Sequence, residues 1–467
     1  MNIHMGQQFH THRVAVTKNL TEGNPYKLIV LFALPVFFSQ VFQQLYNAAD
    51  SVIVGQFLGT TSLAAVSSTG SLITLMVNFF NGTALGASIV ISHCFGAGDN
   101  DGVTRAVHTD LAFGIVSGLI LTVIGVSFTP TLLVWMDTDP EVLPEAIEYF
   151  RYYFLGVIAV VLYNICTGIM NALGDSKRPL VYLIISSLTN IALDLLFVGL
   201  FRWGVWSAAF ATTISQALSC LLCLIHLSKK GEIYSVDFRK IRLHGDMLRR
   251  ILRFGLPAGI QNSVIGLANV IVQTQINSFA KFATAAFGSH SKIEGFAFIP
   301  ITSFSMALTT FVGQNLGAQK YDRARRAAIF GILSAALMAE AIGVFYYFAA
   351  PHLIAIFDDT PLVIEYGVRQ ARISSLFYCM LAFSHSVAAV CRGAGKAIVP
   401  MVIMLSVWCL LRILYIIAVM HIFGDIVHVY WAYPITWAIS SVIYLIYFLF
   451  SDWIHGYETK PRKILKN

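Results

Sequence analysis

The chain has 467 residues, of which 57% are hydrophobic and only 12% are charged, and its mean hydropathy is +0.71. Polar residues this scarce cannot cover a soluble globule of this size, so the composition excludes a soluble fold. The net charge of +7 does not indicate nucleic-acid binding, because the placement of the basic residues between apolar stretches explains it better. The chain is therefore expected to lie in a lipid bilayer.

Stretches without Asp, Glu, Lys or Arg divide the chain into twelve predicted membrane-spanning helices, since about 20 apolar residues cross the hydrocarbon core. The predicted fold class is an all-α integral membrane protein. The first two stretches cover residues 28–49 and 51–98, and the second contains a turn at Gly59-Thr60-Thr61. The other ten cover 106–134, 152–173, 179–200, 204–226, 254–280, 287–316, 327–350, 368–391, 398–422 and 429–450.

The basic residues predict the orientation, because Lys and Arg near helix ends stay on the cytoplasmic side. If the N-terminus is inside, most of the 31 basic residues fall in inside segments, whereas Arg202 and Lys281 fall outside. We expect a multi-pass protein of the cell membrane with both termini in the cytoplasm. The same orientation predicts outside loops for the acidic residues Asp137, Asp139, Glu141, Glu145, Asp358, Asp359 and Glu365.

The second half of the sequence repeats landmarks of the first half about 222 residues later. Leu34-Pro35 matches Leu256-Pro257, and Phe95-Gly96-Ala97 matches Leu316-Gly317-Ala318. Six spans in each copy give both halves the same orientation, as in carriers built from two lobes around a cleft. We predict two pseudo-symmetric six-helix bundles. The domains are a cytoplasmic tail (1–27), a first lobe (28–227), a basic cytoplasmic linker (228–250), a second lobe (251–452) and a second tail (453–467).

Polar side chains inside the predicted spans indicate a cation-binding site, because such groups are costly in lipid and usually face a cavity or a partner. Asp50 closes the first span, and Asn190 and Asp194 share one face of the fifth. On the sixth span, Thr212 and Thr213 follow Ala208 and Ala209. Oxygen ligands of these kinds suit Na⁺ or a proton and do not suit a soft transition metal. The alternative is that Asp50 sits at the membrane interface and Asp194 pairs elsewhere.

Further residues are candidates for a substrate cleft. Aromatic ring faces attract organic cations, which makes Phe42, Tyr46 and Tyr163 candidates, and Asn47 lies on the same helix face as Asp50. In the second half, Lys292 and Glu294 are two residues apart and cannot face each other on a helix. Both are included as cleft candidates, and a structural hydrogen bond within the bundle is an equally good interpretation of Glu294.

Five short motifs on this repeated plan resemble the multidrug and toxic compound extrusion (MATE) transporters, and specifically their DinF-like branch. The resemblance covers nearly the whole chain. The motifs are Ala33-Leu34-Pro35, Asp50-Ser-Val-Ile-Val-Gly-Gln, Asn190-Ile-Ala-Leu-Asp194, Lys292-Ile-Glu294-Gly-Phe-Ala-Phe and Phe311-Val-Gly-Gln-Asn-Leu-Gly-Ala318. The resemblance implies export of cationic amphiphilic drugs or dyes in exchange for Na⁺ or H⁺.

The same resemblance implies roles for individual residues. The DinF-like cation site falls on Asp50, Asn190, Asp194 and Thr212, and Pro35 matches the proline at which the first helix bends. The chain departs from the NorM-like pattern, which places carboxylates in the seventh and tenth spans. Those spans carry Gln261, Asn262 and His385 instead, which speaks against a cation site in the second lobe.

Two other functions fit parts of the sequence. A flippase for a lipid-linked precursor would need basic residues in its cleft to hold the diphosphate, and the candidates are Arg151, Lys292, Arg369, Arg372 and Arg412. A membrane-embedded transferase would need clustered Asp or His at the membrane face, where Asp137, Asp139, Asp358 and Asp359 are the best set. No Gly-x4-Gly-Lys-Ser/Thr phosphate loop occurs, so ATP is not the expected energy source. The preferred prediction is a monomeric antiporter for small-molecule cations, without enzymatic activity or cofactors.

The predicted orientation can be tested with inserted tags. A tag near Arg239, in the basic linker, should be accessible only from the cytoplasm, and a tag near Asp139 only from outside, because the basic residues hold the linker on the cytoplasmic side. Labelling of intact and opened cells measures both positions. Reversed accessibility at the two tags would overturn the orientation.

Overall fold

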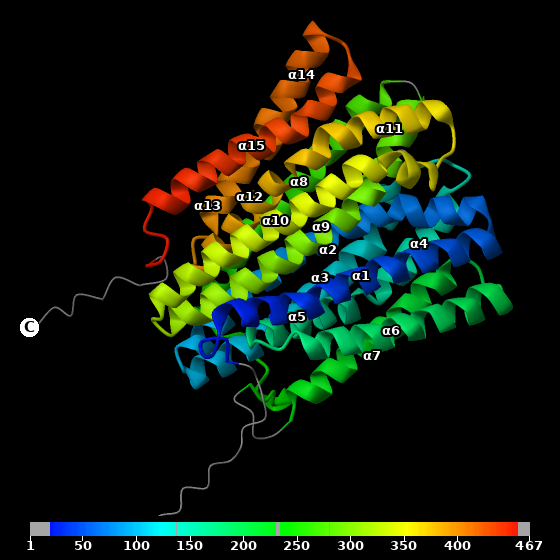
Figure 1. Ribbon diagram of the computed structural model, residues 1–467. Coiled ribbons are helices and arrows are strands. Elements are labelled where there is room, and N and C mark those ends of the chain that lie inside the picture. The colour runs from blue at the N-terminus through cyan, green and yellow to red at the C-terminus, as the bar shows by residue number, and fades with distance from the viewer. Residues whose placement is uncertain (1–18, 137, 230–233, 280, 456–467) are drawn as a thin grey trace, which may run out of the picture.

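The computed structural model describes residues 19–136, 138–229, 234–279 and 281–455, and the regular elements in these ranges are all helices (Figure 1). The first half contains seven α-helices, and a π-helical turn follows the sixth. They are α1 (Pro25–Leu58), α2 (Thr60–Gly96), α3 (Asn100–Trp135), α4 (Leu143–Leu155), α5 (Val157–Ala172), α6 (Lys177–Asp194), the π-turn η1 (Leu195–Leu200) and α7 (Trp206–Leu227).

The second half contains eight α-helices. A short 3-10 turn, η2 (Phe238–Lys240), precedes them in the linker. They are α8 (Gly245–Asn277), α9 (Lys281–Gly317), α10 (Tyr321–Ala355), α11 (Pro361–Ser374), the 3-10 turn η3 (Ser375–Phe377), α12 (Tyr378–Gly393), α13 (Ile398–Met404), the π-turn η4 (Leu405–Leu411), α14 (Arg412–Ile422) and α15 (Ile426–Phe450).

The all-α membrane fold is confirmed. Within the described residues, ten helical segments are long and apolar enough to cross a bilayer, and the bent pair α4 and α5, which meet at 49°, makes an eleventh. Helix α2 has 37 residues and is long enough for a twelfth. The arrangement therefore agrees with twelve predicted spans, several of which are interrupted.

The prediction that the first span ends near Asp50 is wrong. Helix α1 continues without a break to Leu58, because residues 51–58 contain no helix-breaking proline. The break comes at Gly59, whose φ of 93° lies in a region that other residues rarely adopt, so the predicted turn is confirmed there. Asp50 therefore lies inside a helix, eight residues before its end.

Two acidic residues expected in outside loops lie in helices instead. Glu145 belongs to the first turn of α4, and Glu365 belongs to α11. Both helices are amphipathic and begin with a proline in the first turn, so a search for uninterrupted apolar stretches misses their first half. Helix α8 similarly begins at Gly245, within the residues predicted as linker.

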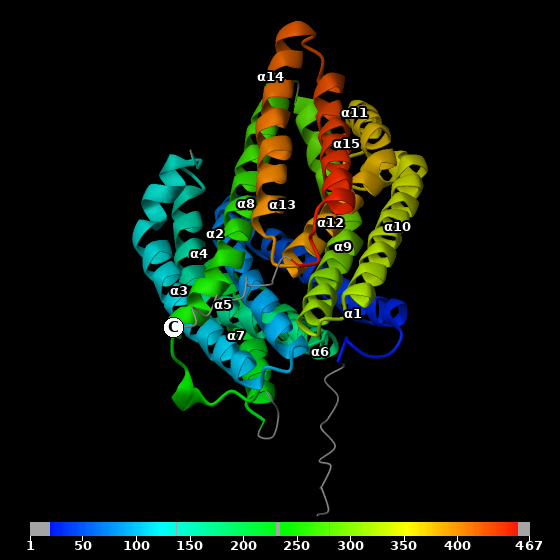
Figure 2. The same ribbon diagram turned by 90° about the vertical axis from the view of Figure 1, so that its left-hand side faces the viewer.

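The described helices form two lobes, α1–α7 and α8–α15, and each has its own hydrophobic core (Figure 2). Phe150, Phe154 and Ile165 are fully or almost fully buried in the first core, and Tyr346 and Trp437 in the second. A smaller cluster between the lobes joins Phe32 of α1 to Phe304 of α9. This arrangement agrees with the repeat seen in the sequence.

The lobes pack against each other along α2 and α8, and they also meet at the C-terminal ends of α2 and α9 through a reciprocal contact. His93 Nε2 of α2 lies 2.7 Å from the carbonyl oxygen of Gly393 in the second lobe, and Gln314 Nε2 of α9 donates to the Ala172 carbonyl oxygen of the first lobe at 2.7 Å. His93 and Gln314 occupy equivalent positions in the two copies of the repeat, and so do the two acceptors, Ala172 and Gly393. The pseudo-symmetry of the sequence is therefore also a symmetry of this inter-lobe contact.

Two glycines let these helix ends approach. A Cβ atom on Gly96 would overlap the carbonyl oxygen of Gln314, and a Cβ atom on Gly317 would overlap that of His93. The positions are again related by the repeat. Any larger side chain would separate the lobes at this end.

The segment just before α1 binds to the second lobe at the same end of the molecule. Leu20 is buried, and its backbone N–H donates to Gln314 Oε1 at 3.1 Å. The Arg323 guanidinium donates to the carbonyl oxygens of Gly23, Leu20 and Glu22 at 2.6, 3.1 and 3.0 Å. At this end the His455 ring also lies 5.1 Å from that of Tyr321, so the first and last described residues are at one end of the bundle.

The glycine contact predicts a position-specific effect on stability. Gly317→Ala should lower the thermal midpoint by an amount equivalent to about 1–3 kcal/mol, because the methyl group has no space against the His93 carbonyl. Gly288→Ala on the same helix is the control, since its Cβ would meet nothing within 4 Å and alanine favours helix. Thermal scans of the purified variants measure both, and equal midpoints would contradict the packing argument.

Candidate functional site

One face of α1 carries polar side chains along the bundle interior. Gln40, Gln43, Gln44, Asn47 and Asp50 recur at spacings that return to the same helix face. This polar stripe borders two adjacent cavities of about 480 and 610 Å³. The cavities share four wall residues, Gln43, Asn47, Tyr163 and Asn164.

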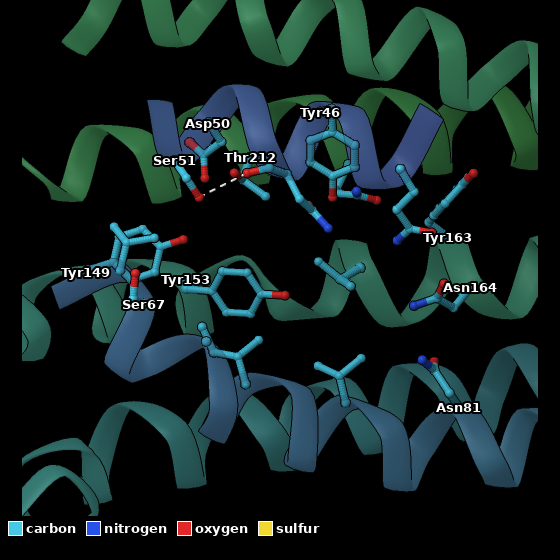
Figure 3. A pocket seen from close by; sticks show the side chains of 18 residues that line it. Tyr46, Asp50, Ser51, Ser67, Asn81, Tyr149, Tyr153, Tyr163, Asn164 and Thr212 are labelled. Carbon is cyan, nitrogen blue, oxygen red and sulfur yellow. Dashed lines mark hydrogen bonds between the residues drawn. The ribbon is translucent and has the colours of Figure 1, made fainter. Parts of the chain in front are cut away.

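The two cavities differ in position. The smaller one lies within the first lobe, with walls from α1, α2, α4, α5 and α7. Figure 3 shows Asp50 and Thr212 toward one end of it and Asn81 and Asn164 toward the other. The larger one lies between the lobes, because Phe298, Ile299 and Thr302 of α9 complete a wall begun by α1, α5 and α6. Together, the two cavities lead from a polar recess within the first lobe to the space between the lobes.

The predicted cation-site residues come together at the polar recess. Asp50 is buried and reaches the cavity wall, and Asp194 is fully buried behind it. Helix α1 packs against α6 and η1, so the two carboxylates lie on adjoining elements, a contact that the sequence could not establish. Asn190 Nδ2 donates to Thr212 Oγ1 at 3.5 Å, so the amide and the hydroxyl also belong to this group.

The group contains more acceptors than donors. Asp50 Oδ1, both carboxylate oxygens of Asp194 and Asn190 Oδ1 are buried without a hydrogen-bond partner in the described part of the chain. Two buried carboxylates side by side repel each other when both are ionised. A proton shared by the pair, or one Na⁺ bound by these oxygens, would remove the repulsion and satisfy the acceptors.

The local sequence explains this placement. Asp194 is the last α-helical residue of α6, and the wider π-helical turn of η1 follows immediately. π-helical turns inside α-helices occur frequently at functional sites. Ala208 is fully buried on α7 in a cluster with Val54 of α1, and Thr212, one turn later on α7, lines the same cavity as Asp50.

The remaining sequence candidates lie in different places. Tyr46, Asn47 and Tyr163 line the cavities. Phe42 does not appear in either wall and packs against the first-lobe core. Pro35 is buried inside α1, where its carbonyl oxygen accepts from Ser39 Oγ at 2.9 Å.

Lys292 and Glu294 also lie outside both cavity walls. Lys292 Nζ sits 5.4 Å from the centre of the Phe357 ring. Glu294 Oε1 is 3.8 Å from His290 Nε2, and His290 Nδ1 lies 2.8 Å from the Tyr346 hydroxyl. Glu294 therefore belongs to a polar network inside the second lobe.

Several wall residues were missed at the sequence level. Gln43, Asn164, Gln216, Tyr149 and Tyr153 all line the smaller cavity. The spacing of the α1 glutamines contained a usable signal, because amides repeated on one face of an otherwise apolar helix indicate a cavity. The tyrosines gave no such signal, since they resemble ordinary interfacial or core aromatics.

Comparison with known proteins gives consistent matches over nearly the whole chain. The family model MatE matches residues 35–196 and 257–417, once in each half. A probable multidrug resistance protein, YoeA of Bacillus subtilis, is 27% identical over 443 residues, which cover 93% of this chain and 96% of the relative. An FAD transporter of Shewanella oneidensis is 25% identical over 328 residues, 69% of this chain and 72% of the relative.

Solved structures share the fold. An outward-facing multidrug resistance MATE family transporter of the MOP superfamily superimposes with a TM-score of 0.86 at 23% identity, covering 93% of this chain and 97% of that one. A MOP superfamily transporter from Pyrococcus furiosus gives a TM-score of 0.87 at 23% identity and the same coverage.

The carboxylate pair predicts stabilisation by cations. Adding NaCl at pH 8.5, or lowering the pH to 6, should raise the thermal midpoint of the wild type, because either cation neutralises the pair. A Na⁺ concentration one hundred times its dissociation constant would add about 2.7 kcal/mol. Asp194→Asn should show a smaller gain under both conditions, since only one charge remains.

Asp322→Asn, an exposed change on α10, is the matched control and should respond like the wild type. Choline chloride replaces NaCl to separate specific binding from ionic strength. An undiminished response in Asp194→Asn would show that the cation acts elsewhere.

Proposed function

The chain belongs to the MatE family, and on that basis we propose that it is a secondary antiporter that exports organic small molecules, among them cationic amphiphilic drugs, in exchange for H⁺ or Na⁺. It is a multi-pass membrane protein of a family of multidrug efflux transporters. The observation that carries the proposal is the buried pair Asp50 and Asp194, with its unpartnered oxygens beside a cavity that leads to the space between the lobes.

The exchange follows from the charge of this pair. When a cation leaves, Asp50 becomes negative at the cavity wall and attracts a cationic cargo. When a proton or Na⁺ returns, the negative charge is lost and the cargo is held less tightly. Each ligand therefore lowers the affinity for the other, which is the coupling that an exchanger requires.

Alternation of access would use the contact between the lobes. One of the tight contacts between them is at Gly96 and Gly317, and the larger cavity lies between the lobes farther along the bundle. If the lobes separated at this glycine contact and closed at the opposite end, the cavity would open to the other side of the membrane. Pro35 in α1 and Pro257 in α8 remove backbone donors within helices that border the lobe interface, which makes bending of these helices easier.

The alternative functions have less support. Neither cavity has a Lys or Arg in its described walls, so a lipid diphosphate would find no counter-charge there. Arg412 is buried against the Tyr433 ring at 4.5 Å, and Arg372 lies 5.5 Å from the Tyr347 ring. Two of the acidic residues suggested for a transferase cap turns, since Asp139 Oδ1 accepts from the Glu141 N–H and Asp358 Oδ1 from that of Thr360, and Asp137 lies outside the described residues.

The decisive experiment is ethidium efflux from vesicles under separately imposed Na⁺ and H⁺ gradients. Asp50→Asn should abolish gradient-driven efflux and leave the protein folded, because it fixes the neutral state of the site. Asn190→Ala and Asp194→Asn should impair efflux to a similar degree. Thr212→Ala should be milder, since it removes only a neutral ligand.

Thr213→Ala is the control for the threonine change, because the Thr213 hydroxyl donates to the Ala209 carbonyl oxygen and does not line the cavity. Normal pumping by Asp50→Asn together with an inactive Glu294→Gln would place the coupling site in the second lobe and refute the assignment.

A further inference from the structure

The walls of the two cavities contain an unusual concentration of neutral amides. On α1 they are Gln40, Gln43, Gln44 and Asn47, and on α5 Asn164 and Asn171 face the same space. Each amide group offers both a donor and an acceptor and carries no net charge. The first-lobe side of the larger cavity is therefore a hydrogen-bonding wall.

One of these amides lacks satisfactory partners. Asn171 is only 5% exposed, its Oδ1 has no hydrogen-bond partner in the described structure, and its Nδ2 contacts only the Met306 sulfur at 3.4 Å. A thioether is a weak acceptor. Because buried polar groups are normally paired, an amide of this kind in a cavity wall indicates a ligand that supplies the missing bonds.

The opposite side of the larger cavity has a different chemistry. It comes from α9, where Phe298, Ile299 and Met306 are apolar and Gly295 leaves open space. Thr302 is the polar exception, and its hydroxyl is already used as a donor to Gln40 Oε1 at 2.6 Å. One wall is thus rich in hydrogen-bonding groups, and the facing wall offers an apolar surface with an aromatic ring.

Charge is nearly absent from both cavities. Asp50 is the one ionisable Asp, Glu, Lys, Arg or His in their described walls, and it belongs to the proposed coupling site at the far end of the smaller cavity. A cargo in the larger cavity therefore meets no charged side chain. Recognition there must come from hydrogen bonds, shape and apolar contact.

From these features we infer that the chamber binds neutral, planar heteroaromatic compounds whose edges carry several amide-like donors and acceptors. The ring edge pairs with the amides of α1 and α5, and a ring face packs against Phe298 and Ile299. Binding in the larger cavity does not require positive charge on the cargo, since the attraction to Asp50 acts in the smaller cavity. Each cavity has a volume within the range of roughly 300–1,000 Å³ that is common for small-molecule sites, which suits a compound the size of a nucleoside or a flavin.

This inference refines the cargo of the proposed transporter and depends on that proposal only in taking the chamber as the transport site. The test is equilibrium binding to the purified protein without any gradient. Riboflavin is the probe for the proposed class, because its ring edge carries amide-like groups and it is uncharged at neutral pH. Tetraphenylphosphonium is the contrasting probe, because it is an aromatic cation without hydrogen-bonding groups.

Replacing an amide by leucine keeps the size of the side chain and removes its hydrogen bonds. Gln43→Leu and Asn171→Leu should each weaken riboflavin binding roughly tenfold, the effect expected for one lost hydrogen bond with a group left unpaired. Tetraphenylphosphonium binding should stay the same or become tighter. Gln273→Leu is the matched control, since Gln273 lies on α8 outside both cavity walls and pairs with Asn277 at 2.7 Å.

Gln43 is exposed to the cavity, so Gln43→Leu tests the inference even if Asn171→Leu fails to fold. Absence of riboflavin binding to the wild type, or equal loss in Gln273→Leu and Gln43→Leu, would overturn the inference. Gradient-driven ethidium efflux without riboflavin binding would refute only the inferred cargo class. Amide-dependent riboflavin binding without any gradient-driven efflux would refute only the antiporter.

Discussion

Lipid supplies no hydrogen-bond partner to a polar group, and the organisation of this protein depends on that constraint. Backbone groups must pair within helices, which explains why every regular element in the described residues is helical. Polar side chains within the spans must turn inward, and the stripe from Gln40 to Asp50 does so along α1. The cavities and the carboxylate pair thus share one cause, which is the exclusion of polar groups from the lipid-facing surface.

The two lobes are alike in architecture and unlike in chemistry. Their reciprocal contact pairs His93 with Gly393 and Gln314 with Ala172, so both copies of the repeat use the same positions to meet. In the sites themselves the copies differ, because the repeat position of Asp50 is Val272, a fully buried residue in an apolar cluster. Both copies of the repeat thus contribute equivalent positions to the contact, whereas among the described residues the paired carboxylates belong to the first copy.

This asymmetry divides the tasks within the chamber. The first lobe contributes the carboxylates and nearly all the amides, while α9 of the second lobe contributes mainly apolar surface. Movement of one lobe against the other would therefore separate the hydrogen-bonding wall from the apolar wall and weaken both kinds of contact with a cargo at once. In the proposed transport cycle the four predicted cation-site residues would move as a unit, since Asp50, Asn190, Asp194 and Thr212 all belong to the first lobe.

The sequence by itself determined the membrane fold and marked Asp50, Asn190 and Asp194 as candidate site residues, because hydropathy and rare polar residues in apolar spans are local properties of the chain. Matching landmarks in the two halves predicted the repeat, and the family resemblance selected Thr212. Helix ends at amphipathic segments were less predictable, as Glu145 and Glu365 show, since these segments lack a continuous apolar run. Only the tertiary structure decided that α1 passes Asp50 uninterrupted and packs against α6, which carries Asp194. It also decided that Phe42 packs into a core and that amides from α1 and α5 share one chamber. Those facts depend on how helices distant in sequence rotate and pack against each other, and that geometry comes from the fit of whole helix surfaces, such as the glycines that bring α2 and α9 together.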